Sequence, residues 1–362
     1  MSYTLYGSQA SYFTAKARAY LRWRGVSYHE QAVSGELMQQ RLLPTIGWPV
    51  VPVLELADGS LVQDTEDIIA AVEARTSGPR ALPAQGLQRV VSLLLQLFAD
   101  EWLTLPAMHY RWNMNEQWIY GEFGRSSAPD ASAAEQHTLG ERIGARFKGF
   151  VPMLGVTAQT IPGIEASYEQ FLADFSAHLA EHPFVLGGRA SYGDFALVGP
   201  LFAHLLRDPA SGELMQRLAP QVVDWTQRVH GGNGQLGALL QDDAVPMTLQ
   251  PILRRHLADH WPVLEETAQR CAHWSRSAEP GAELPRGFDT LSFTVGGCDG
   301  EAAARSFPLY RLQAVLDAIA ALVGDERERA AAWLAACDAQ ALLDWRLPVR
   351  LERRRYRLCL AR

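Results

Sequence analysis

The sequence predicts an α/β domain at the N-terminus, followed by an all-helical domain and a mostly helical extension. Strand-like and helix-like patterns alternate over residues 1–76, and after the turn-rich segment 77–86 the apolar residues recur with helical spacing. A length of 362 residues is too great for one hydrophobic core and indicates two or three domains. We place the helical domain at residues 87–244 and the extension at residues 245–362.

The first strand of the α/β domain runs through a polar turn into the first helix. Residues 3–6 (YTLY) are strand-like, residues 7–14 form the turn, and residues 15–21 (AKARAYL) have a helical pattern. The first turn of a helix leaves N–H groups unpaired and the helix dipole favours negative charge there, so this turn suits a sulfur anion. Taken alone, such a turn more often has only a conformational role. A second strand is expected near Tyr28.

A hairpin led by a proline follows, after a second helix and a loop. Pro52 directly precedes the apolar run 53–56 (VLEL). Proline cannot donate to a sheet ladder, so it belongs at a strand start, and X-Pro bonds are where cis peptides occur. Asp58 and Gly59 then predict a turn into a second strand at residues 60–63 (SLVQ).

The α/β domain is expected to end with a helix that begins at its own capping residues. Residues 64–67 (DTED) place a hydroxyl and acids before the helical run 68–73 (IIAAVE), as N-terminal capping requires. The predicted order is therefore strand, helix, strand, helix, proline-led strand, hairpin strand and helix.

With these motifs in this order, the chain resembles the glutathione transferases, whose N-terminal domain has the thioredoxin fold. Residues 11–14 (SYFT) fall where serine-type transferases place the hydroxyl that meets the glutathione sulfur. Val51 and Pro52 match the family's cis-proline pair, whose preceding backbone binds the cysteinyl part of the tripeptide. Asp64 and Thr65 match its acid-or-glutamine plus Ser/Thr pair, which holds the γ-glutamyl end at a helix N-terminus.

The resemblance implies that Ser11 donates a hydrogen bond to the thiolate of bound glutathione, assisted by backbone N–H groups near Phe13 and Thr14. A free thiol has a pKa near ~8.5, and a helix N-terminus with a hydroxyl donor brings it below neutrality. The ionised sulfur then attacks an electrophilic carbon, with glutathione as co-substrate. The alternatives for the role of Ser11 are Ser8, Tyr12 and Tyr6. The glutathione site is predicted to comprise Ser11, Tyr12, Phe13, Val51, Pro52, Asp64 and Thr65.

The two ends of the tripeptide need different partners. Asp64 accepts from the γ-glutamyl ammonium, and the Thr65 hydroxyl and N–H donate to the γ-glutamyl carboxylate. Helix capping alone explains the same two residues without a ligand. The glycyl carboxylate needs a cation, for which Arg41 and His29 are candidates. Residues 39–48 show no clear match to the family's lysine or glutamine, so this end stays unassigned.

Cysteine-based and metal-based chemistry are not expected in the first domain. The four cysteines are Cys271, Cys298, Cys337 and Cys359. They all lie in the last quarter of the chain and have neither C-x-x-C nor metal-ligand spacing, so the thiol must come from the substrate. His256 and His260 have the spacing of a two-histidine metal face. No glutamate follows the first histidine and no third ligand is in view, so we expect a pair on a helix surface and no metal.

The resemblance implies an electrophile pocket between the first two domains, facing the first long helix of the second. Residues 108–113 (MHYRWN) form an aromatic and cationic segment there, and Pro106 predicts a kink beside it. Such a segment suits an aromatic or anionic substrate, so we assign His109, Arg111 and Trp112 to the pocket. A buried aromatic core explains each of these residues equally well.

Other segments of the helical domain and the extension have structural interpretations. Ser191 and Asp194 form a capping box that in the family starts a buried central helix. Residues 121–140 are expected to form a mobile surface loop. In the extension, amphipathic helices are expected around residues 252–258 and 310–323. The chain is expected to finish with a strand near Tyr356, Leu358 and Leu360 that pairs with residues 291–295.

Composition and charge limit the expected partners. The net charge of −7 does not favour a nucleic-acid binder, and the basic cluster at residues 350–357 is expected to be a solvated face. No run approaches the ~18 consecutive apolar residues of a membrane span. Since the N-terminus also lacks a signal-peptide pattern, we expect a cytoplasmic protein. The family resemblance implies a homodimer that uses glutathione and a small electrophile, and the alternative is a non-catalytic binding or regulatory module with the same fold.

Overall fold

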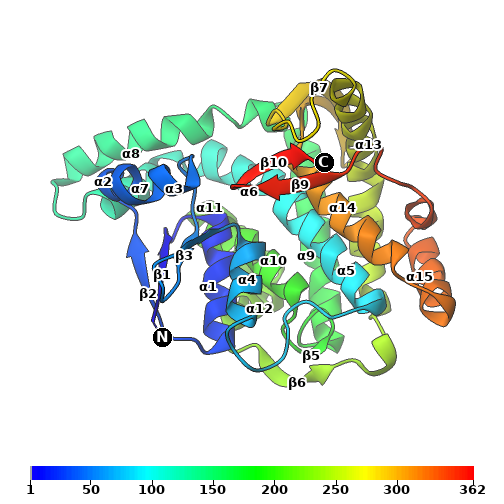
Figure 1. Cartoon of the computed structure of the whole chain (residues 1–362). Coiled ribbons are helices and arrows are strands. Elements are labelled where there is room, and N and C mark those ends of the chain that lie inside the picture. The colour runs from blue at the N-terminus through cyan, green and yellow to red at the C-terminus, as the bar shows by residue number, and fades with distance from the viewer. Residues whose placement is uncertain (1) are drawn as a thin grey trace. The chain divides into compact units, whose positions relative to one another are not determined.

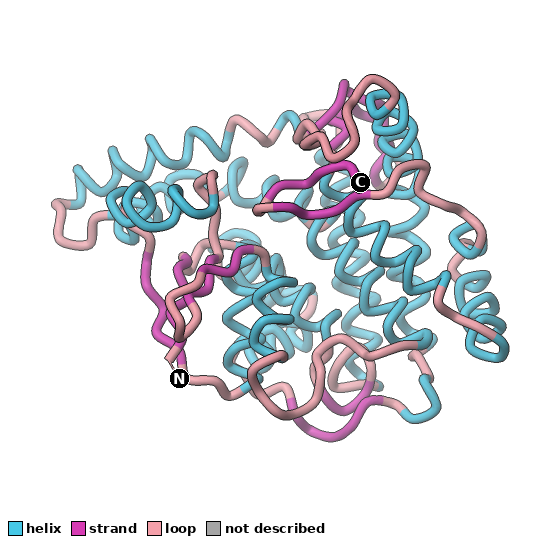
Figure 2. The backbone as a smooth tube through the Cα atoms, viewed as in Figure 1, coloured by secondary structure: helices cyan, strands magenta, loops and turns pink. Residues whose placement is uncertain are grey.

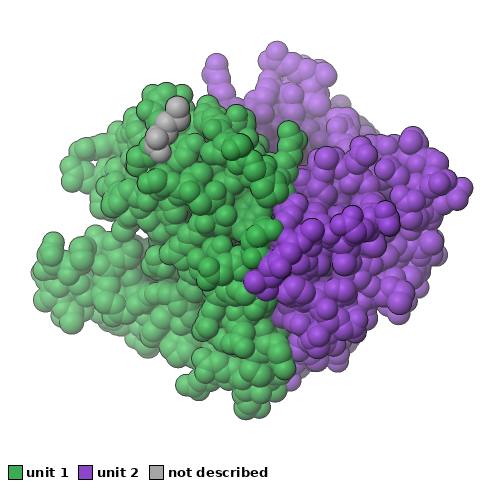
Figure 3. All heavy atoms as spheres, turned by 90° about the horizontal axis from the view of Figure 1, so that it is seen from below, with its two compact units in different colours: residues 1–81, 106–151, 194–235 green, residues 82–105, 152–193, 236–362 purple. Residues whose placement is uncertain are grey.

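The computed structural model describes residues 2–362, and the chain divides into two compact units (Figure 3). Unit 1 comprises residues 1–81, 106–151 and 194–235. Unit 2 comprises residues 82–105, 152–193 and 236–362. Each unit combines segments that are distant in the sequence, so the predicted boundaries of successive domains stay predictions.

Unit 1 contains a four-stranded mixed sheet, whose strands are magenta in Figure 2. The strand order is β2-β1-β3-β4. Its strands are β1 (Tyr3–Gly7), β2 (Tyr28–Ala32), β3 (Val53–Glu55) and β4 (Leu61–Gln63). β1 and β2 are parallel, and β3 is antiparallel to β1 and β4. A parallel pair needs a crossover connection, which α1 (Tyr12–Arg24) supplies. This arrangement confirms the predicted thioredoxin-like domain, including the strand near Tyr28 and the hairpin.

Helices α1 and α4 (Thr65–Glu73) lie side by side in this domain (Figure 1). The Tyr20 hydroxyl of α1 donates to the backbone carbonyl of Ile69 in α4, at 3.5 Å. Both side chains are buried, so the two helices share one apolar core. Between β2 and β3 the chain forms α2 (Gly35–Leu37), η1 (Met38–Leu42) and α3 (Leu43–Ile46).

The rest of unit 1 is helical. The helices that lie wholly or mainly in it are α6 (Thr104–His109), η3 (Tyr110–Met114), α7 (Glu116–Ser127), α8 (Ala133–Lys148), α10 (Tyr192–Pro200), η5 (Leu201–Leu206), α11 (Pro209–Leu218) and α12 (Pro220–His230). α10 begins one residue after Ser191, and both Ser191 and Asp194 are buried. This placement is consistent with the structural role expected for the two residues.

The prediction of a mobile loop over residues 121–140 is wrong, because α7 and α8 form a helical hairpin there. Glycines in this stretch serve close helix packing and not chain flexibility. A Cβ atom on Gly124 would lie 1.9 Å from the Gln136 carbonyl oxygen, and one on Gly140 would lie 1.8 Å from the Tyr120 carbonyl oxygen. The capping box of α8 at Ser132 is the sequence signal that could have revealed the second helix.

Unit 2 is mostly helical, with three two-stranded sheets. Its helices are α5 (Gly86–Leu97), η2 (Phe98–Trp102), η4 (Pro152–Leu154), α9 (Ile161–Glu181), η6 (Gln241–Asp243), η7 (Met247–Leu249), α13 (Gln250–Ser275), α14 (Phe307–Ala320), α15 (Gly324–Ala336) and η8 (Gln340–Leu343). Its strand pairs are β5 (Gly187–Arg189) with β6 (Gln235–Leu239), β7 (Gly287–Val295) with β8 (Cys298–Arg305), and β9 (Leu351–Arg354) with β10 (Arg357–Leu360). The two helices expected in the extension are present as α13 and α14.

The predicted pairing of the final strand is wrong. β10 pairs with β9, while residues 291–295 belong to β7 and pair with β8. Each pair is joined by a tight turn of two residues with positive φ, Gly296 and Gly297 in one case and Arg355 and Tyr356 in the other. Local hairpin closure therefore supplies the partner of each strand before a distant strand can do so.

The expectation that His256 and His260 lie on a helix surface is also wrong. The side chains of His256 and His260, both in α13, are each 2% exposed. The His256 ring lies 4.9 Å from the Phe98 ring, and the His260 ring stacks on Trp102 at 4.6 Å. Burial lowers the pKa of His256 to about 3 and that of His260 well below its ordinary value. The pair is therefore a neutral part of the unit 2 core.

One helical run, from Gly86 to Met114, has the length and composition of a membrane span. It is 29 residues long, and its most apolar window of 18 residues has a mean hydropathy of 1.3. Its most apolar window is 94% buried inside the structure. A core helix passes the same test of length and composition, so this run is weak evidence for a membrane span.

Substituting Gly140 with alanine should destabilise the α7–α8 hairpin. The added methyl group would collide with a backbone carbonyl, and overpacking of this kind costs about 1–3 kcal/mol. Urea unfolding measures the effect. Gly121→Ala, where the added Cβ would meet only the flexible end of Arg125, is the matched control and should not destabilise. Equal stability of Gly140→Ala and the wild type would contradict the close packing.

Burial of neutral His256 should make stability fall as pH decreases below about 6.5. In the unfolded chain His256 is protonated below its ordinary pKa of about 6.5, whereas in the native state it stays neutral until the pH approaches its pKa of about 3. The free energy of unfolding therefore falls by at most about 1.4 kcal/mol per pH unit between these two pKa values. His256→Leu removes this proton and should show a shallower decline from pH 6.5 to 4 in urea unfolding. His29→Gln, at an exposed position, is the control. Parallel curves for wild type and His256→Leu would refute the assignment.

Candidate functional site

The strand registers bring the three predicted motifs to one end of the unit 1 sheet. Val53 of β3 pairs with Tyr6 of β1 and with Gln63 of β4. Pro52 therefore lies level with the C-terminal end of β1, where the turn into α1 begins. Asp64 follows β4 at the same level. Three segments that are far apart in the sequence thus share one sheet end, which is the candidate site.

Ser11 is the N-cap of α1. Its backbone is extended (φ −85°, ψ 123°), and its Oγ accepts the Thr14 N–H at 3.2 Å. The side chain is half-buried. A hydroxyl that accepts in the cap keeps its hydrogen for donation to another group. Ser11 therefore offers an O–H donor at a helix N-terminus, where the helix dipole favours an anion.

The turn before Ser11 is compact. The Ser11 N–H donates to the Ser8 carbonyl at 3.1 Å, and the Ser8 hydroxyl accepts the Ala10 N–H at 3.3 Å. β1 reaches α1 closely here, because a Cβ on Gly7 would lie only 2.3 Å from a methyl carbon of Thr14. The turn therefore needs a glycine at the end of β1.

The alternatives to Ser11 have other roles. The Tyr6 hydroxyl donates to the Glu55 carboxylate at 2.5 Å, and burial together with this carboxylate raises its pKa. Tyr12 is 7% exposed, and its ring packs edge-on against His204 at 5.5 Å. The Ser8 hydroxyl accepts the Ala10 N–H within the turn and, unlike that of Ser11, does not cap α1. Phe13, beside Tyr12 in the first turn of α1, is half-buried. These contacts favour Ser11 as the donor to a sulfur anion.

The peptide bond between Val51 and Pro52 is cis, as expected. Pro52 is buried and leads directly into β3, whereas Val51 is half-buried. The pair therefore occupies the position at which the family resemblance places the backbone that binds the cysteinyl part of glutathione.

Asp64 and Thr65 begin α4 in an unusual backbone conformation. Asp64 has φ 82° and ψ 139°, and its carboxylate accepts the Glu66 N–H at 3.0 Å. A non-glycine residue at positive φ costs on the order of 1–3 kcal/mol, and such strain is concentrated at functional sites. The Thr65 side chain is 1% exposed, and its hydroxyl oxygen is buried with no hydrogen-bond partner among residues 2–362. The Thr65 hydroxyl is therefore enclosed by the protein, which argues against the expectation that it donates to a ligand carboxylate.

The two candidates for the glycyl carboxylate lie away from the candidate site. Arg41 pairs with Glu55 at 2.7 Å and donates to the carbonyl of Gly59, in the turn at the opposite end of the β3–β4 hairpin. His29 lies beside Thr4, near the N-terminal end of β1. The register thus separates both cations from the sheet end that holds Ser11.

The three residues assigned to the electrophile pocket lie in the interior. His109, Arg111 and Trp112 are 2%, 3% and 2% exposed. All five N–H groups of Arg111 are used by partners within unit 1. The assignment of Arg111 to substrate binding is therefore corrected, because no donor of this guanidinium is left for a ligand. The segment is the aromatic core that the sequence allowed as its alternative.

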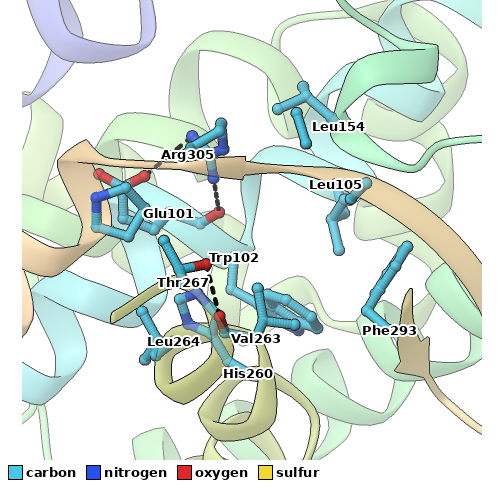
Figure 4. Close-up of a pocket in the computed structure, with 13 residues that line it drawn as sticks. Glu101, Trp102, Leu105, Leu154, His260, Val263, Leu264, Thr267, Phe293 and Arg305 are labelled. Atoms are coloured by element: carbon cyan, nitrogen blue, oxygen red, sulfur yellow. Dashed lines mark hydrogen bonds and ion pairs between the residues drawn. The ribbon is translucent and has the colours of Figure 1, made fainter. Parts of the chain in front are cut away.

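Unit 2 contains a small cavity of about 30 Å³ between α13, η2 and the β7–β8 pair (Figure 4). Its lining includes His260, Trp102, Phe293 and the ion pair between Glu101 and Arg305, at 3.0 Å. Burial raises the pKa of Glu101. A water molecule needs at least about 10–15 Å³, so this cavity accommodates a water molecule or two and not a tripeptide.

Within residues 2–362, no group of three or more His, Cys, Asp or Glu side chains is arranged to hold a metal ion. The four cysteines are free thiols in unit 2. Burial raises the pKa of Cys271 to about 11 and that of Cys337 to about 12, which makes these two thiols unreactive. The candidate site in unit 1 therefore depends on oxygen and nitrogen donors.

Residues 5–80 match the family model described as glutathione S-transferase, N-terminal domain. This span contains all three motifs at the sheet end. Residues 5–80 therefore carry a glutathione S-transferase N-terminal domain. No curated protein sequence matches the chain.

Solved structures of glutathione transferases are similar at low identity. The glutathione S-transferase from Rhodospirillum rubrum F11 is 17% identical, with a TM-score of 0.41 over 67% of this chain and 96% of its own. The beta-etherase LigF from Sphingobium sp. strain SYK-6 is 16% identical, with a TM-score of 0.46 over 63% and 95%. A family member from Pseudomonas fluorescens Pf-5 with bound glutathione is 16% identical, with a TM-score of 0.37 over 65% and 100%. The N-terminal match and the sheet topology together identify the N-terminal domain.

Two substitutions of Asp64 should separate the energetic cost of its positive φ from the contribution of its side chain as a helix cap. Asp64→Ala loses the carboxylate cap and keeps the positive φ of the wild type, so it should destabilise by about 0.5–2 kcal/mol, the cost of a lost cap. Asp64→Gly also loses the cap but relieves the strain, so its stability should stay close to that of the wild type. Urea unfolding of the two variants tests the order, and a less stable glycine variant would contradict it.

Proposed function

We propose that this protein binds glutathione at the end of the unit 1 sheet and activates its thiolate for attack on a small electrophile. One observation carries the proposal. Ser11 caps α1 through its oxygen, and its hydroxyl hydrogen is thereby available to a sulfur anion at the helix N-terminus. Hydrogen bonds to charged groups contribute about 1.5–3 kcal/mol each, so this donor favours the thiolate over the thiol.

The other two motifs hold the tripeptide so that its sulfur meets Ser11. The backbone before cis-Pro52 binds the cysteinyl part, and the Asp64 carboxylate accepts from the γ-glutamyl ammonium. The N–H of Thr65, in the first turn of α4, donates to the γ-glutamyl carboxylate. The thiolate sulfur then forms a bond to the electrophilic carbon as the leaving group departs with its electron pair.

A second candidate is a non-catalytic module with the glutathione transferase fold that binds or regulates another molecule. It is favoured by the positions of Arg41 and His29, which lie away from the sheet end and leave the glycyl carboxylate without an assigned cation. Under either function, we propose a homodimer on the family resemblance alone.

Replacing Ser11 with alanine should raise the pKa of the bound glutathione thiol and lower kcat about 10- to 100-fold. This range corresponds to the loss of one charge-assisted hydrogen bond of about 1.5–3 kcal/mol. Ultraviolet absorbance of the thiolate against pH measures the pKa, and turnover of a panel of electrophiles measures kcat. Ser11→Thr keeps the hydroxyl and the cap, so it should retain most of the activity.

Ser8→Ala is the matched control, because it removes a neighbouring hydroxyl that lies outside the α1 cap. It should leave the thiol pKa unchanged. Unchanged turnover and unchanged glutathione affinity in Ser11→Ala would refute the thiolate role of this residue. Isothermal titration of the wild type with glutathione separates the two candidate functions, and a lack of binding would favour the non-catalytic module.

A further inference from the structure

Two buried arginines of unit 1 hold the turn that precedes Ser11. Arg111, in η3, donates through Nη1 to the carbonyl of Ala10 at 2.8 Å. Arg18, in α1, donates through Nη2 to the carbonyl of Ser8 at 3.3 Å. Their side chains are 3% and 0% exposed. The two guanidinium groups therefore reach this turn from inside the protein.

The guanidinium of Arg111 is itself fixed by a complete set of acceptors. Asp208 accepts two of its N–H groups, at 2.7 and 2.8 Å, in a bidentate pair. The carbonyl of Ala203 and the imidazole of His204 accept two more, both at 2.6 Å, and the carbonyl of Ala10 accepts the fifth. A planar group with five occupied donors has one orientation, so the carbonyl of Ala10 is held in place.

The surroundings of this ion pair are arranged for it. Asp208 is the N-cap residue of α11, yet its carboxylate does not cap that helix. The side-chain oxygen of Asn115 instead accepts the Ala210 N–H at the start of α11, at 3.0 Å. Both Asp208 carboxylate oxygens hydrogen-bond to Arg111 instead. The Asp208 carboxylate thus binds Arg111 of η3 and does not cap α11. We take this as a sign that Arg111 has a specific role.

His204 has a defined protonation state in this network. Arginine only donates, so the His204 Nε2 that meets Arg111 must be an acceptor. The ring proton is then on Nδ1, facing the Ala107 carbonyl at 3.3 Å. Burial and the Arg111 charge lower the pKa of His204 well below its ordinary value, consistent with a neutral ring. The charged groups of this network are therefore Arg111 and Asp208, which form an ion pair.

We propose that Arg111 is a positioning residue for Ser11. The carbonyl of Ala10 and the N–H of Ser11 belong to the same planar peptide group. Arg111 holds the oxygen of this group, and the Ser8 carbonyl holds its N–H, at 3.1 Å. With both ends of the peptide plane bound, the N–Cα bond of Ser11 is held, and the φ of −85° at the α1 cap then sets the direction of the Ser11 side chain. This inference rests on the proposed function, since it assigns the orientation of the thiolate donor.

The effect works through orientation and not through charge. Arg111 and Asp208 neutralise each other within the interior, and the guanidinium has no donor left for a ligand. Its influence on the sulfur therefore passes only through the Ala10 peptide to Ser11. Arg111 is accordingly not a catalytic residue, and its loss should alter the geometry of the site without removing a group that touches glutathione.

The test replaces the ion pair by apolar residues of similar size, in the double variant Arg111→Met/Asp208→Leu. Changing Arg111 alone would leave a buried unpaired carboxylate and threaten folding, whereas replacing both partners is commonly tolerated. Hydrogen exchange measured by mass spectrometry on peptides covering residues 7–15 reports the turn directly. We expect exchange at least about tenfold faster than in the wild type, because the peptide plane has lost one of its two anchors.

Function in the same variant supplies a second readout. The pKa of the bound glutathione thiol should rise by about one unit and kcat should fall about tenfold, with a smaller change in KM for glutathione. Arg305→Met/Glu101→Leu removes a partly exposed ion pair in unit 2 and is the control for the loss of an ion pair away from the turn. It should leave both the exchange of residues 7–15 and the thiol pKa as in the wild type.

The outcomes separate this inference from the proposed function. Unchanged exchange of residues 7–15 in the Arg111 double variant overturns the positioning role, whatever glutathione does. Faster exchange with an unchanged thiol pKa also overturns it, provided that Ser11→Ala raises that pKa. If Ser11→Ala leaves the thiol pKa unchanged, the proposed function itself fails, and the claim that Arg111 orients a thiolate donor fails with it.

Discussion

The register of three strands in unit 1 is the constraint on which the candidate site depends. Val53 pairs with both Tyr6 and Gln63, so the start of β3, the end of β1 and the end of β4 meet at one level. This pairing places the cap of α1, the cis-proline bond and the cap of α4 at the same sheet end. A slip of one residue would turn each side chain to the other face of the sheet and break this arrangement.

Helix caps at this sheet end combine a structural with a proposed functional role. Ser11 accepts from the α1 backbone and keeps its hydrogen for a ligand, and Asp64 caps α4 at a strained φ of 82°. The cap residues are therefore polar for reasons of folding, and the sheet register brings them to the same sheet end. Behind them, Arg111 and Arg18 hold the carbonyls of the turn, so the donor geometry depends on buried groups that touch no ligand in the proposed mechanism.

The errors of the sequence interpretation have a common physical cause, which is that composition does not reveal a residue's long-range partner. Residues 121–140 were expected to form a loop. Instead, α7 and α8 pack so closely at Gly124 and Gly140 that no methyl group fits between them. Arg111 suited an anionic substrate until the structure showed Asp208, far along the chain, taking two of its donors. His256 and His260 likewise have the helical spacing of a surface pair, and only packing against Phe98 and Trp102 makes them core residues.

The sequence by itself determined the elements of the N-terminal domain, their order and the three motifs, because caps, turns and the position of a proline are local properties of the chain. It also located the principal helices of the extension, whose apolar spacing is equally local. Only the tertiary structure decided which hydroxyl is available, which cations lie away from the sheet end and which polar side chains are buried. Those outcomes depend on strand register and on hydrogen bonds between residues distant in the chain, where many partners are compatible with the same local pattern.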